Sequence, residues 1–228
     1  MEFAKNARGE RIHASNADKI QNYFCPICCQ KVKPKQGKIK AEHFAHEIPC
    51  EDSWHYDMSE WHSQWQAQFP VGNREIVVTH LSEKHRADVV AYGYVIEFQH
   101  SPITAEEFEE RNSFYLSCGK KVIWIFDFVS EYSENQIEWY DDEGNLAKYK
   151  WRYPVRFLQS YIPQHEKDII VFFQMAKEDH TNEDASYIER VTWAIEEYGV
   201  SNFKRFQTSY SSPGNAIQLL QCIKERKL

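Results

Sequence analysis

The sequence predicts an α/β protein in three parts: a small N-terminal β module, a central α/β core and a C-terminal α+β region. Three observations lead to this organisation. Residues 1–52 are broken by Gly and Pro and carry cysteines and histidines at metal-ligand spacing. Residues 53–128 follow the order helix, three strands, helix and buried strand, which is typical of a sheet with a helical crossover. Residues 129–228 mix strand and helix patterns, so we expect an accessory region there.

Composition limits the class of protein. The 228 residues are 42% hydrophobic and 15% aromatic, which predicts a globular chain with a sizeable core. No apolar run approaches the roughly 20 residues that span a bilayer, and the opening MEFAKNARGE has no hydrophobic segment of the secretory type. We therefore expect a cytoplasmic protein without a membrane partner. The net charge of −7 does not by itself favour a nucleic-acid partner.

The N-terminal module contains a Cys-x₂-Cys-x₁₄-His-x₂-His pattern. Its members are Cys25, Cys28, His43 and His46. Cysteines of a cytoplasmic chain are reduced, so we interpret them as metal ligands before disulfides. Two thiolates and two imidazoles suit a closed, structural Zn²⁺ site, which would stabilise a segment with little core of its own. Cys29 and Cys50 are substitutes for these ligands, and buried thiols without a metal are the alternative.

The central core opens with a helix in SEWHSQWQAQF, residues 59–69. Ser59 is placed to cap this helix at its N-terminus. The apolar stripe consists of Trp61, Trp65 and Phe69. A proline and a glycine follow and end the helix. His62 lies outside the apolar stripe, so we expect it to be a polar residue of the helix surface.

Three strand-like segments follow at short intervals and predict an antiparallel meander. They are REIVVTHL (74–81), RADVVAYG (86–93) and YVIEFQHS (94–101). The next helix begins with Thr104 and Glu107 in capping-box positions and ends at Gly119. The run KKVIWIFDF after it is apolar on both faces, which predicts a central strand reached by a helical crossover.

The C-terminal region has weaker patterns. IEWYDDEGNLAKYKW predicts a hairpin that turns at residues 143–145, and DIIVFFQM predicts another strand. DASYIERVTWAIEEYG predicts an amphipathic helix over 184–199, and a last helix is expected near 215–226. This region is where a protein partner or a second copy of the chain could bind.

The second and third strand segments bring two acids together if their hairpin turns about Tyr92-Gly93. Residues whose numbers sum to 185 then face each other, so Asp88 lies opposite Glu97. Like charges on opposite residues are unfavourable unless something neutralises them. With the carbonyl of Phe98, these acids offer oxygen ligands to Mg²⁺ or Mn²⁺. The alternative is a surface ion network in which Arg86 pairs with either acid.

These motifs in this order resemble the PD-(D/E)XK nuclease superfamily, with Gln99 in the position of its lysine. More narrowly, they resemble the competence protein CoiA-like family. The likeness covers about residues 3–128 and rests on five segments. These are FCPICCQKV…GKIKAEHFAH, SEWHSQWQAQF, RADVV, IEFQHS and RNSFYLSCGKKVIWIF. It implies a PD-(D/E)XK nuclease-like core that follows the zinc-binding β module.

The resemblance also implies a set of site residues. Glu60 joins Asp88 and Glu97 as the acidic set. The residues that line the same site are Gln99, Ser101, Arg111 and Tyr115. In this interpretation Gln99 orients the attacking water, Arg111 contacts the scissile phosphate, and the other two contact DNA. Glutamine lacks the positive charge of lysine, so an active site, a slow one and an inactive one all stay open.

A basic patch lies between the two pairs of zinc ligands. It consists of Lys31, Lys33, Lys35, Lys38 and Lys40. Contacts to phosphate need local rather than net positive charge, so these lysines are candidate DNA-binding residues despite the acidic chain. A solvated loop without a ligand is the alternative.

The leading functional hypothesis is a Mg²⁺- or Mn²⁺-dependent nuclease that cleaves DNA, in recombination or uptake of incoming DNA or in defence against it. The second hypothesis is a zinc-containing DNA-binding protein whose nuclease fold is degenerate and not catalytic. A third is an interaction scaffold on which the acid pair is ordinary surface. Binding of a divalent ion and cleavage of DNA discriminate between the three.

Overall fold

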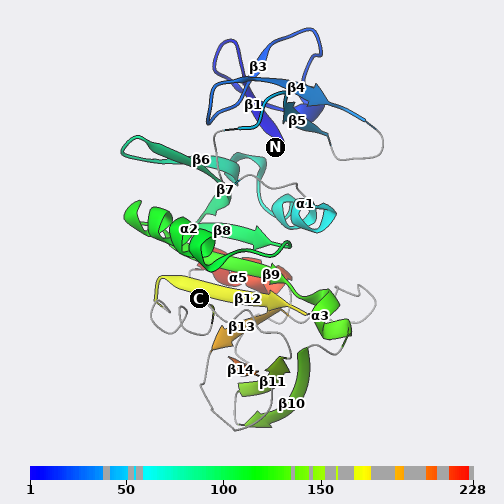
Figure 1. Ribbon diagram of the computed structural model, residues 1–228, viewed down its shortest axis with the longest axis vertical. Coiled ribbons are helices and arrows are strands. Elements are labelled where there is room, and N and C mark those ends of the chain that lie inside the picture. The colour runs from blue at the N-terminus through cyan, green and yellow to red at the C-terminus, as the bar shows by residue number, and fades with distance from the viewer. Residues whose placement is uncertain are drawn as a thin grey trace. The chain divides into compact units, whose positions relative to one another are not determined.

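The computed structural model divides the chain into two compact units, Met1–Val90 and Ala91–Leu228 (Figure 1). The residues that it describes are 1–37, 42–50, 54, 59–134, 137–143, 146–151, 158, 167–175, 188–192, 204–209 and 216–225. The predicted mixed α/β fold is confirmed, because both sheets and helices are present. Among the helices of these residues, none is long and apolar enough to cross a bilayer.

The first unit begins with a small antiparallel sheet in the order β2-β1-β3-β4-β5. Its strands are β1 (Phe3–Asn6), β2 (Arg11–His13), β3 (Tyr23–Phe24), β4 (Lys31–Lys35) and β5 (His43–His46), with a 3₁₀ turn at Ala14–Asn16. The rings of Tyr23 and Phe44 pack at 5.0 Å in its core. That core is small and is completed by short side chains such as Ala4 and Ala14. A sheet with so little apolar volume is the kind that a structural metal stabilises.

Helix α1 (Glu60–Ala67) follows the small sheet, and its predicted cap is confirmed, because Ser59 Oγ accepts a hydrogen bond from the His62 amide. Trp65 and Phe69 of the predicted stripe are buried, and Trp61 is half-buried. The buried face also includes His62 and Gln66, so its centre is rotated relative to the stripe of every fourth residue. The prediction that His62 is a surface residue is wrong.

Strands β6 (Arg74–His80) and β7 (Glu83–Ala91) form an antiparallel pair after a 3₁₀ turn at Val71–Asn73. The register pairs Thr79 with Lys84 and Val77 with Arg86. Side chains alternate along a strand, so these four residues share one face of the pair. The opposite face carries the buried residues Val78 and Ala87.

The second unit begins with β8 (Tyr94–Gln99), α2 (Ala105–Ser117) and β9 (Lys121–Asp127). Strands β8 and β9 are parallel, which confirms the predicted crossover through a helix. Thr104 Oγ1 accepts from the Glu107 amide at the start of α2. At its end Gly119 has a φ of 68°, and the amides of Gly119 and Lys120 donate to the carbonyls of Leu116 and Tyr115. This pair of hydrogen bonds is a Schellman motif, which explains the glycine.

Strand β9 lies between β8 and β12 (Ile169–Gln174) and is parallel to both. Its five central residues are buried, as predicted from the run of apolar residues, and β12 is buried throughout. The order within this unit continues from β12 through β13 and β14 to β11 and β10. Trp124 on β9 donates to Asn112 on α2 at 2.8 Å and packs against Phe108. These contacts fix the helix on the sheet.

The C-terminal elements confirm most predictions and correct one. Strands β10 (Ile137–Glu143) and β11 (Leu146–Trp151) form the predicted hairpin, and helix α5 (Ala216–Glu225) is the predicted last helix. A short helix, α3 (Val129–Ser133), precedes them. Within the predicted helix over 184–199, the described residues instead form strand β13 (Ile188–Thr192). It pairs with β12 and with β14 (Lys204–Ser209), because sheet pairing outweighs a helical period in a segment of β-branched residues.

Candidate active site and metal centre

Four side chains of the first unit are grouped as a metal site would require. The ligand atoms of Cys25, Cys28, His46 and Cys50 all lie within 4.8 Å of one another. The sulfurs of Cys25 and Cys50 are 3.9 Å apart, and Cys28 Sγ is 3.4 Å from His46 Nε2. Zn–S bonds of about 2.3 Å and Zn–N bonds of about 2.0 Å place tetrahedral ligands about 3.5–3.8 Å apart. The donor set and its spacing therefore fit Zn²⁺.

A tight turn after β3 presents the first two thiols. The Cys29 amide donates to the Cys25 carbonyl at 3.0 Å, and Cys29 has a φ of 59°. The Ile27 amide points at Cys25 Sγ at 3.4 Å. Burial raises the pKa of the Cys25 thiol to about 12, although amide hydrogen bonds oppose this. Such a thiol ionises at neutral pH when a cation is bound next to it, which is what a metal centre provides.

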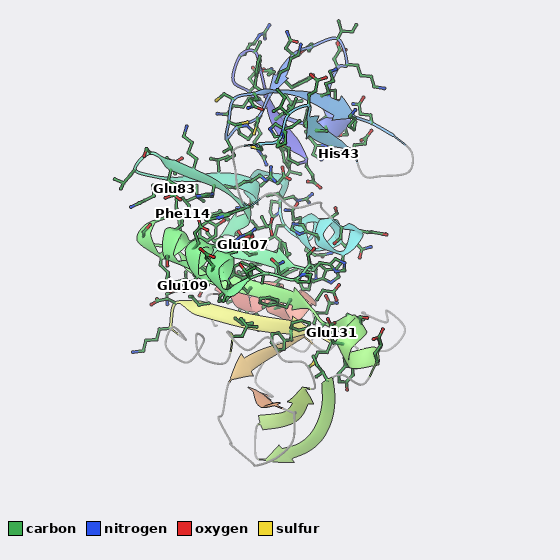
Figure 2. The ribbon with its side chains drawn as sticks, viewed as in Figure 1. His43, Glu83, Glu107, Glu109, Phe114 and Glu131 are labelled. Carbon is green, nitrogen blue, oxygen red and sulfur yellow. The ribbon has the colours of Figure 1, made fainter. Side chains whose placement is uncertain are left out.

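His43, which Figure 2 labels, does not belong to this group. Cys50 takes the fourth position. The reason is strand geometry. His43 and His46 are three residues apart on β5, so their side chains leave opposite faces of the strand. One imidazole can reach the cluster and the other cannot. Cys29, the second proposed substitute, is exposed. Four protein ligands would leave no open position, so a metal ion held by them would be structural in type.

Within the first unit, a buried side chain of α1 contacts a buried side chain of β7. Asp88 on β7 is 3% exposed and His62 on α1 is 2% exposed. His62 Nε2 lies 3.2 Å from Asp88 Oδ1, and the Gln66 amide group donates to the Asp88 carbonyl at 3.4 Å. Glu60 is exposed, and its Oε1 accepts from Gln64 Nε2 on the outer surface of the helix. The helix thus presents a histidine, rather than the predicted glutamate, to Asp88.

A second buried carboxylate lies in the other unit. Glu97 on β8 is 1% exposed, and both of its oxygens accept hydrogen bonds from α2. Arg111 Nη1 donates to Oε2 at 3.0 Å and Tyr115 Oη donates to Oε1 at 2.8 Å. Arg111 also donates to Glu107 Oε1 at 2.6 Å. The two donors are four residues apart on one helix face, so the predicted grouping of Glu97, Arg111 and Tyr115 is present.

This network fixes the orientation of the Glu97 carboxylate. The guanidinium of Arg111 offsets the cost of burying the carboxylate. Each carboxylate oxygen has two lone pairs, so a metal ion can still bind where a hydrogen bond is already accepted. Arg111 is 3% exposed and donates to two carboxylates. Its geometry therefore suits positioning of Glu97 better than contact with a phosphate.

A further pair of ionisable groups lies at the carboxyl ends of two parallel strands. His100 Nδ1 is 2.7 Å from Asp127 Oδ2. The β8–β9 register pairs Gln99 with Phe126, so the next residue of each strand is brought together. Nearby, burial and the charge of Asp127 raise the pKa of Glu131, which His100 partly opposes. No sequence motif predicts this pair, although residues that follow adjacent parallel strands often form a site.

The remaining predicted residues are placed as follows. Gln99 is at the end of β8 and donates to the Ser101 carbonyl at 2.5 Å. Lys31, Lys33 and Lys35 alternate along β4 and are exposed, so they share one face of that strand. Lys33 forms an ion pair with Glu47, and its hydrogen bond lowers the pKa of that carboxyl. Lys38 and Lys40 lie outside the described residues.

Comparison with known families gives two matches. A family described as competence protein CoiA, N-terminal domain, matches residues 6–51. A second, described as competence protein CoiA, nuclease-like domain, matches residues 57–198, which is more than half of the chain. No curated protein matches the chain, and no solved structure matches it.

Proposed function

The chain belongs to the competence protein CoiA family, and from this premise we propose that it is a metal-dependent nuclease that cleaves DNA. The observation that carries the proposal is the buried carboxylate of Glu97, held by hydrogen bonds from Arg111 and Tyr115. A buried acid in a fixed orientation is a candidate ligand for a divalent cation.

The second proposed cation ligand is Asp88. Tyr92 and Gly93 have φ angles of 54° and 95°, as the two central residues of a type I′ hairpin turn require. Such a turn supports the predicted register in which paired residue numbers sum to 185. We therefore propose Asp88 and Glu97 as joint ligands of Mg²⁺ or Mn²⁺, with the Phe98 carbonyl beside them.

In this proposal the chain supplies orientation. A divalent ion, when bound, would lower the pKa of a water and offset the charge that develops on the phosphate. Arg111 and Tyr115 hold Glu97, and His62 holds Asp88, as outer partners of metal-binding carboxylates do. Gln99 would orient the attacking water through its amide, and Ser101 would contact the DNA backbone.

The N-terminal module would act as a DNA-binding element that a structural Zn²⁺ stabilises. Its ligands in this proposal are Cys25, Cys28, His46 and Cys50. The exposed lysines of β4 would contact phosphates, and a row of cations on one strand face matches the regular spacing of a nucleic-acid backbone. The proposed substrate is incoming DNA in the cytoplasm, which the protein would cleave in recombination or uptake or in defence against foreign DNA.

The alternative function is DNA binding without cleavage. It is favoured by Gln99, because an amide cannot supply the positive charge that the superfamily's lysine provides. The side-chain amide of Gln99 also donates to the Ser101 carbonyl rather than toward a substrate. A protein of this kind would retain the fold and recruit partners through its C-terminal region.

One experiment separates the two functions. Purified protein is incubated with labelled linear and branched DNA, with and without Mg²⁺ or Mn²⁺, and Glu97→Gln protein is the matched control. Ion-dependent cleavage that the variant lacks supports the nuclease. Binding of DNA without cleavage under all conditions would favour the alternative.

A further inference from the structure

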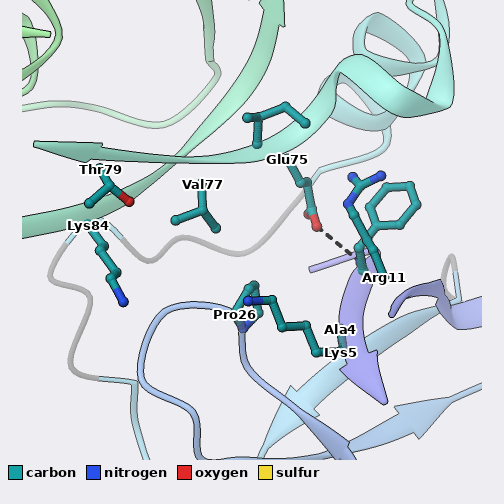
Figure 3. Close-up of a pocket in the computed structure, with 10 residues that line it drawn as sticks. Ala4, Lys5, Arg11, Pro26, Glu75, Val77, Thr79 and Lys84 are labelled. Atoms are coloured by element: carbon teal, nitrogen blue, oxygen red, sulfur yellow. Dashed lines mark hydrogen bonds between the residues drawn. The ribbon is translucent and has the colours of Figure 1, made fainter. Parts of the chain in front are cut away.

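A cavity of about 310 Å³ opens in the first unit, where β1 and β2 approach β6 and β7 (Figure 3). Residues of four strands and of the turn that carries Cys25 line it. They are Phe3, Ala4, Lys5, Arg11, Pro26, Glu75, Ile76, Val77, Thr79 and Lys84. This volume is at the lower end of the range for small-molecule sites, so the cavity has room for one small ligand or one unit of a chain.

One wall of the cavity is apolar and its two ends are polar. Figure 3 shows Val77 between Thr79 and Lys84 at one end and Glu75 and Arg11 at the other, with Pro26 across from it. The β6–β7 register pairs Thr79 with Lys84, so a hydroxyl and an ammonium leave the same face of these strands side by side. The arrangement suits a ligand with an apolar body and an anionic group.

Two lysines from different parts of the sequence converge on the opening. Lys5 is on β1 and Lys84 is on β7, and both side chains are exposed. Within the described part of the chain, neither ammonium has a hydrogen bond or an ion pair. In a protein with a net charge of −7, two unpaired cations at one cavity are a local reversal of sign, which attracts an anion.

The third cation of the lining is fixed in place. Arg11 donates to the carbonyls of Val71 at 3.1 Å and Arg74 at 2.5 Å. Its guanidinium carbon lies 3.3 Å from the ring centre of Phe3. Arg11 therefore contributes positive charge without moving, while the flexible lysines can close on a ligand.

The one carboxylate of the lining does not neutralise the lysines. Glu75 Oε2 accepts hydrogen bonds from the backbone amides of Glu2 at 2.8 Å and Phe3 at 3.1 Å, the second of which Figure 3 marks. Glu75 is buried, with a φ of 45° that turns its side chain toward β1. Three cations against one committed carboxylate leave the cavity positive.

We propose that this cavity binds one nucleotide of a nucleic-acid strand, with its phosphate between Lys5 and Lys84 and its nucleoside against Val77 and Pro26. The Thr79 hydroxyl would donate a hydrogen bond to a phosphate oxygen. The site is distinct from the carboxylates proposed for cleavage and from the lysine row of β4. The role of this site would be to hold a nucleic-acid strand on the protein. Binding there requires no divalent ion.

The first test is binding without added divalent ion. The probes are thymidine 5′-monophosphate and a fluorescent oligothymidylate of twelve nucleotides, titrated over a range of salt concentrations. The double variant Lys5→Gln/Lys84→Gln should weaken the Kd of the oligonucleotide at least tenfold. The slope of log Kd against log salt should fall by about 0.7 units, for the one single-stranded phosphate that the two lysines neutralise.

The matched control is Lys19→Gln/Lys224→Gln, which removes the same charge from two exposed lysines outside the cavity. It should bind as the wild type does. If both probes lose affinity only in the first variant, the site holds a nucleotide as such; if only the oligonucleotide does, it holds a nucleotide within a strand. Equal binding by both double variants would overturn the proposal.

A second test needs no variant. Amine acylation of the wild type, read by peptide mass spectrometry, should label Lys5 and Lys84 several-fold less when the oligonucleotide is bound, and Lys19 equally in both states. Full labelling of Lys5 and Lys84 in the complex would overturn the proposal. Both tests are independent of cleavage, so a protein that cleaves nothing could still pass them, and an active nuclease could fail them.

Discussion

His62 Nε2 lies 3.2 Å from Asp88 Oδ1, and both side chains are almost completely buried. Burial of a carboxylate is costly unless a partner holds it. Here the partner comes from helix α1, with Gln66 on the next turn contacting the Asp88 backbone. Glu60, one half-turn away, is exposed. The contribution of α1 to the candidate site is therefore an imidazole that orients an acid.

Replacing His62 by Leu should reduce cleavage 10- to 100-fold, because an outer partner of a metal-binding carboxylate is lost. The affinity for Mg²⁺ should fall by a similar factor, which isothermal titration measures. The comparison variant is Glu60→Gln, which should change both quantities less than threefold. If instead Glu60→Gln lost cleavage and Mg²⁺ affinity while His62→Leu kept both, Glu60 would belong to the acidic set and His62 would be a packing residue.

Glu97→Gln should abolish cleavage and lower the free energy of unfolding by about 2–4 kcal/mol, because the buried charge of Arg111 loses one of its two carboxylate partners and keeps Glu107. Adding Arg111→Gln should recover part of this stability while cleavage stays absent. Denaturant unfolding and a cleavage assay on the two variants measure both effects. A fully active Glu97→Gln protein would end the assignment of a nuclease site to this residue.

Cys50→Ser and His46→Asn should each reduce bound zinc well below one equivalent per chain, because a closed tetrahedral site needs all four ligands. Cys29→Ser and His43→Asn are the matched controls and should keep one equivalent. Elemental analysis of the purified proteins gives the stoichiometry. Loss of zinc from His43→Asn, with retention in Cys50→Ser, would contradict the geometry of β5.

The pH dependence of stability should carry a contribution from Glu2. Burial and the neighbouring Glu75 raise the pKa of Glu2 above its ordinary value of 4.5. A group with a raised pKa binds more protons in the folded state, so its contribution is complete below pH 4.5 and is lost as pH rises through the folded pKa.

Glu2→Gln should therefore gain stability relative to the wild type as pH rises from 4 to 7. Chemical unfolding across this range measures the difference. Glu10→Gln, a change at an exposed carboxyl, is the control and should show no such trend. A difference between Glu2→Gln and the wild type that stays constant with pH would contradict the raised pKa.

Local features of the fold could be predicted because a few neighbouring residues decide them. Ser59 and Thr104 cap helices through their own hydroxyls, and Gly119 adopts the positive φ that ends α2. The apolar run at 121–127 predicts a central strand, since both faces are covered. The residues of β13 have a helical pattern, and they form a strand because they pair with β12 and β14.

The candidate metal site also combines ligands that a local motif indicates with ligands that only the fold selects. The spacing of Cys25 and Cys28 indicates a ligand pair because one short turn holds both thiols. The other two ligands come from separate segments. His46 is selected over His43 by the alternation of β5, and Cys50 is brought in by the path of the chain.

The helix caps, the Cys25–Cys28 ligand pair and the family resemblance follow from the sequence, since each depends on residues close together or on motifs in order. Which polar groups from distant segments lie next to one another depends instead on the tertiary structure. The contacts of His62 with Asp88 and of His100 with Asp127 arise from helix rotation and strand register, and so does the convergence of Lys5 and Lys84 on one cavity. These arrangements depend on how distant segments pack. A buried charge is tolerated only where such a segment supplies its partner.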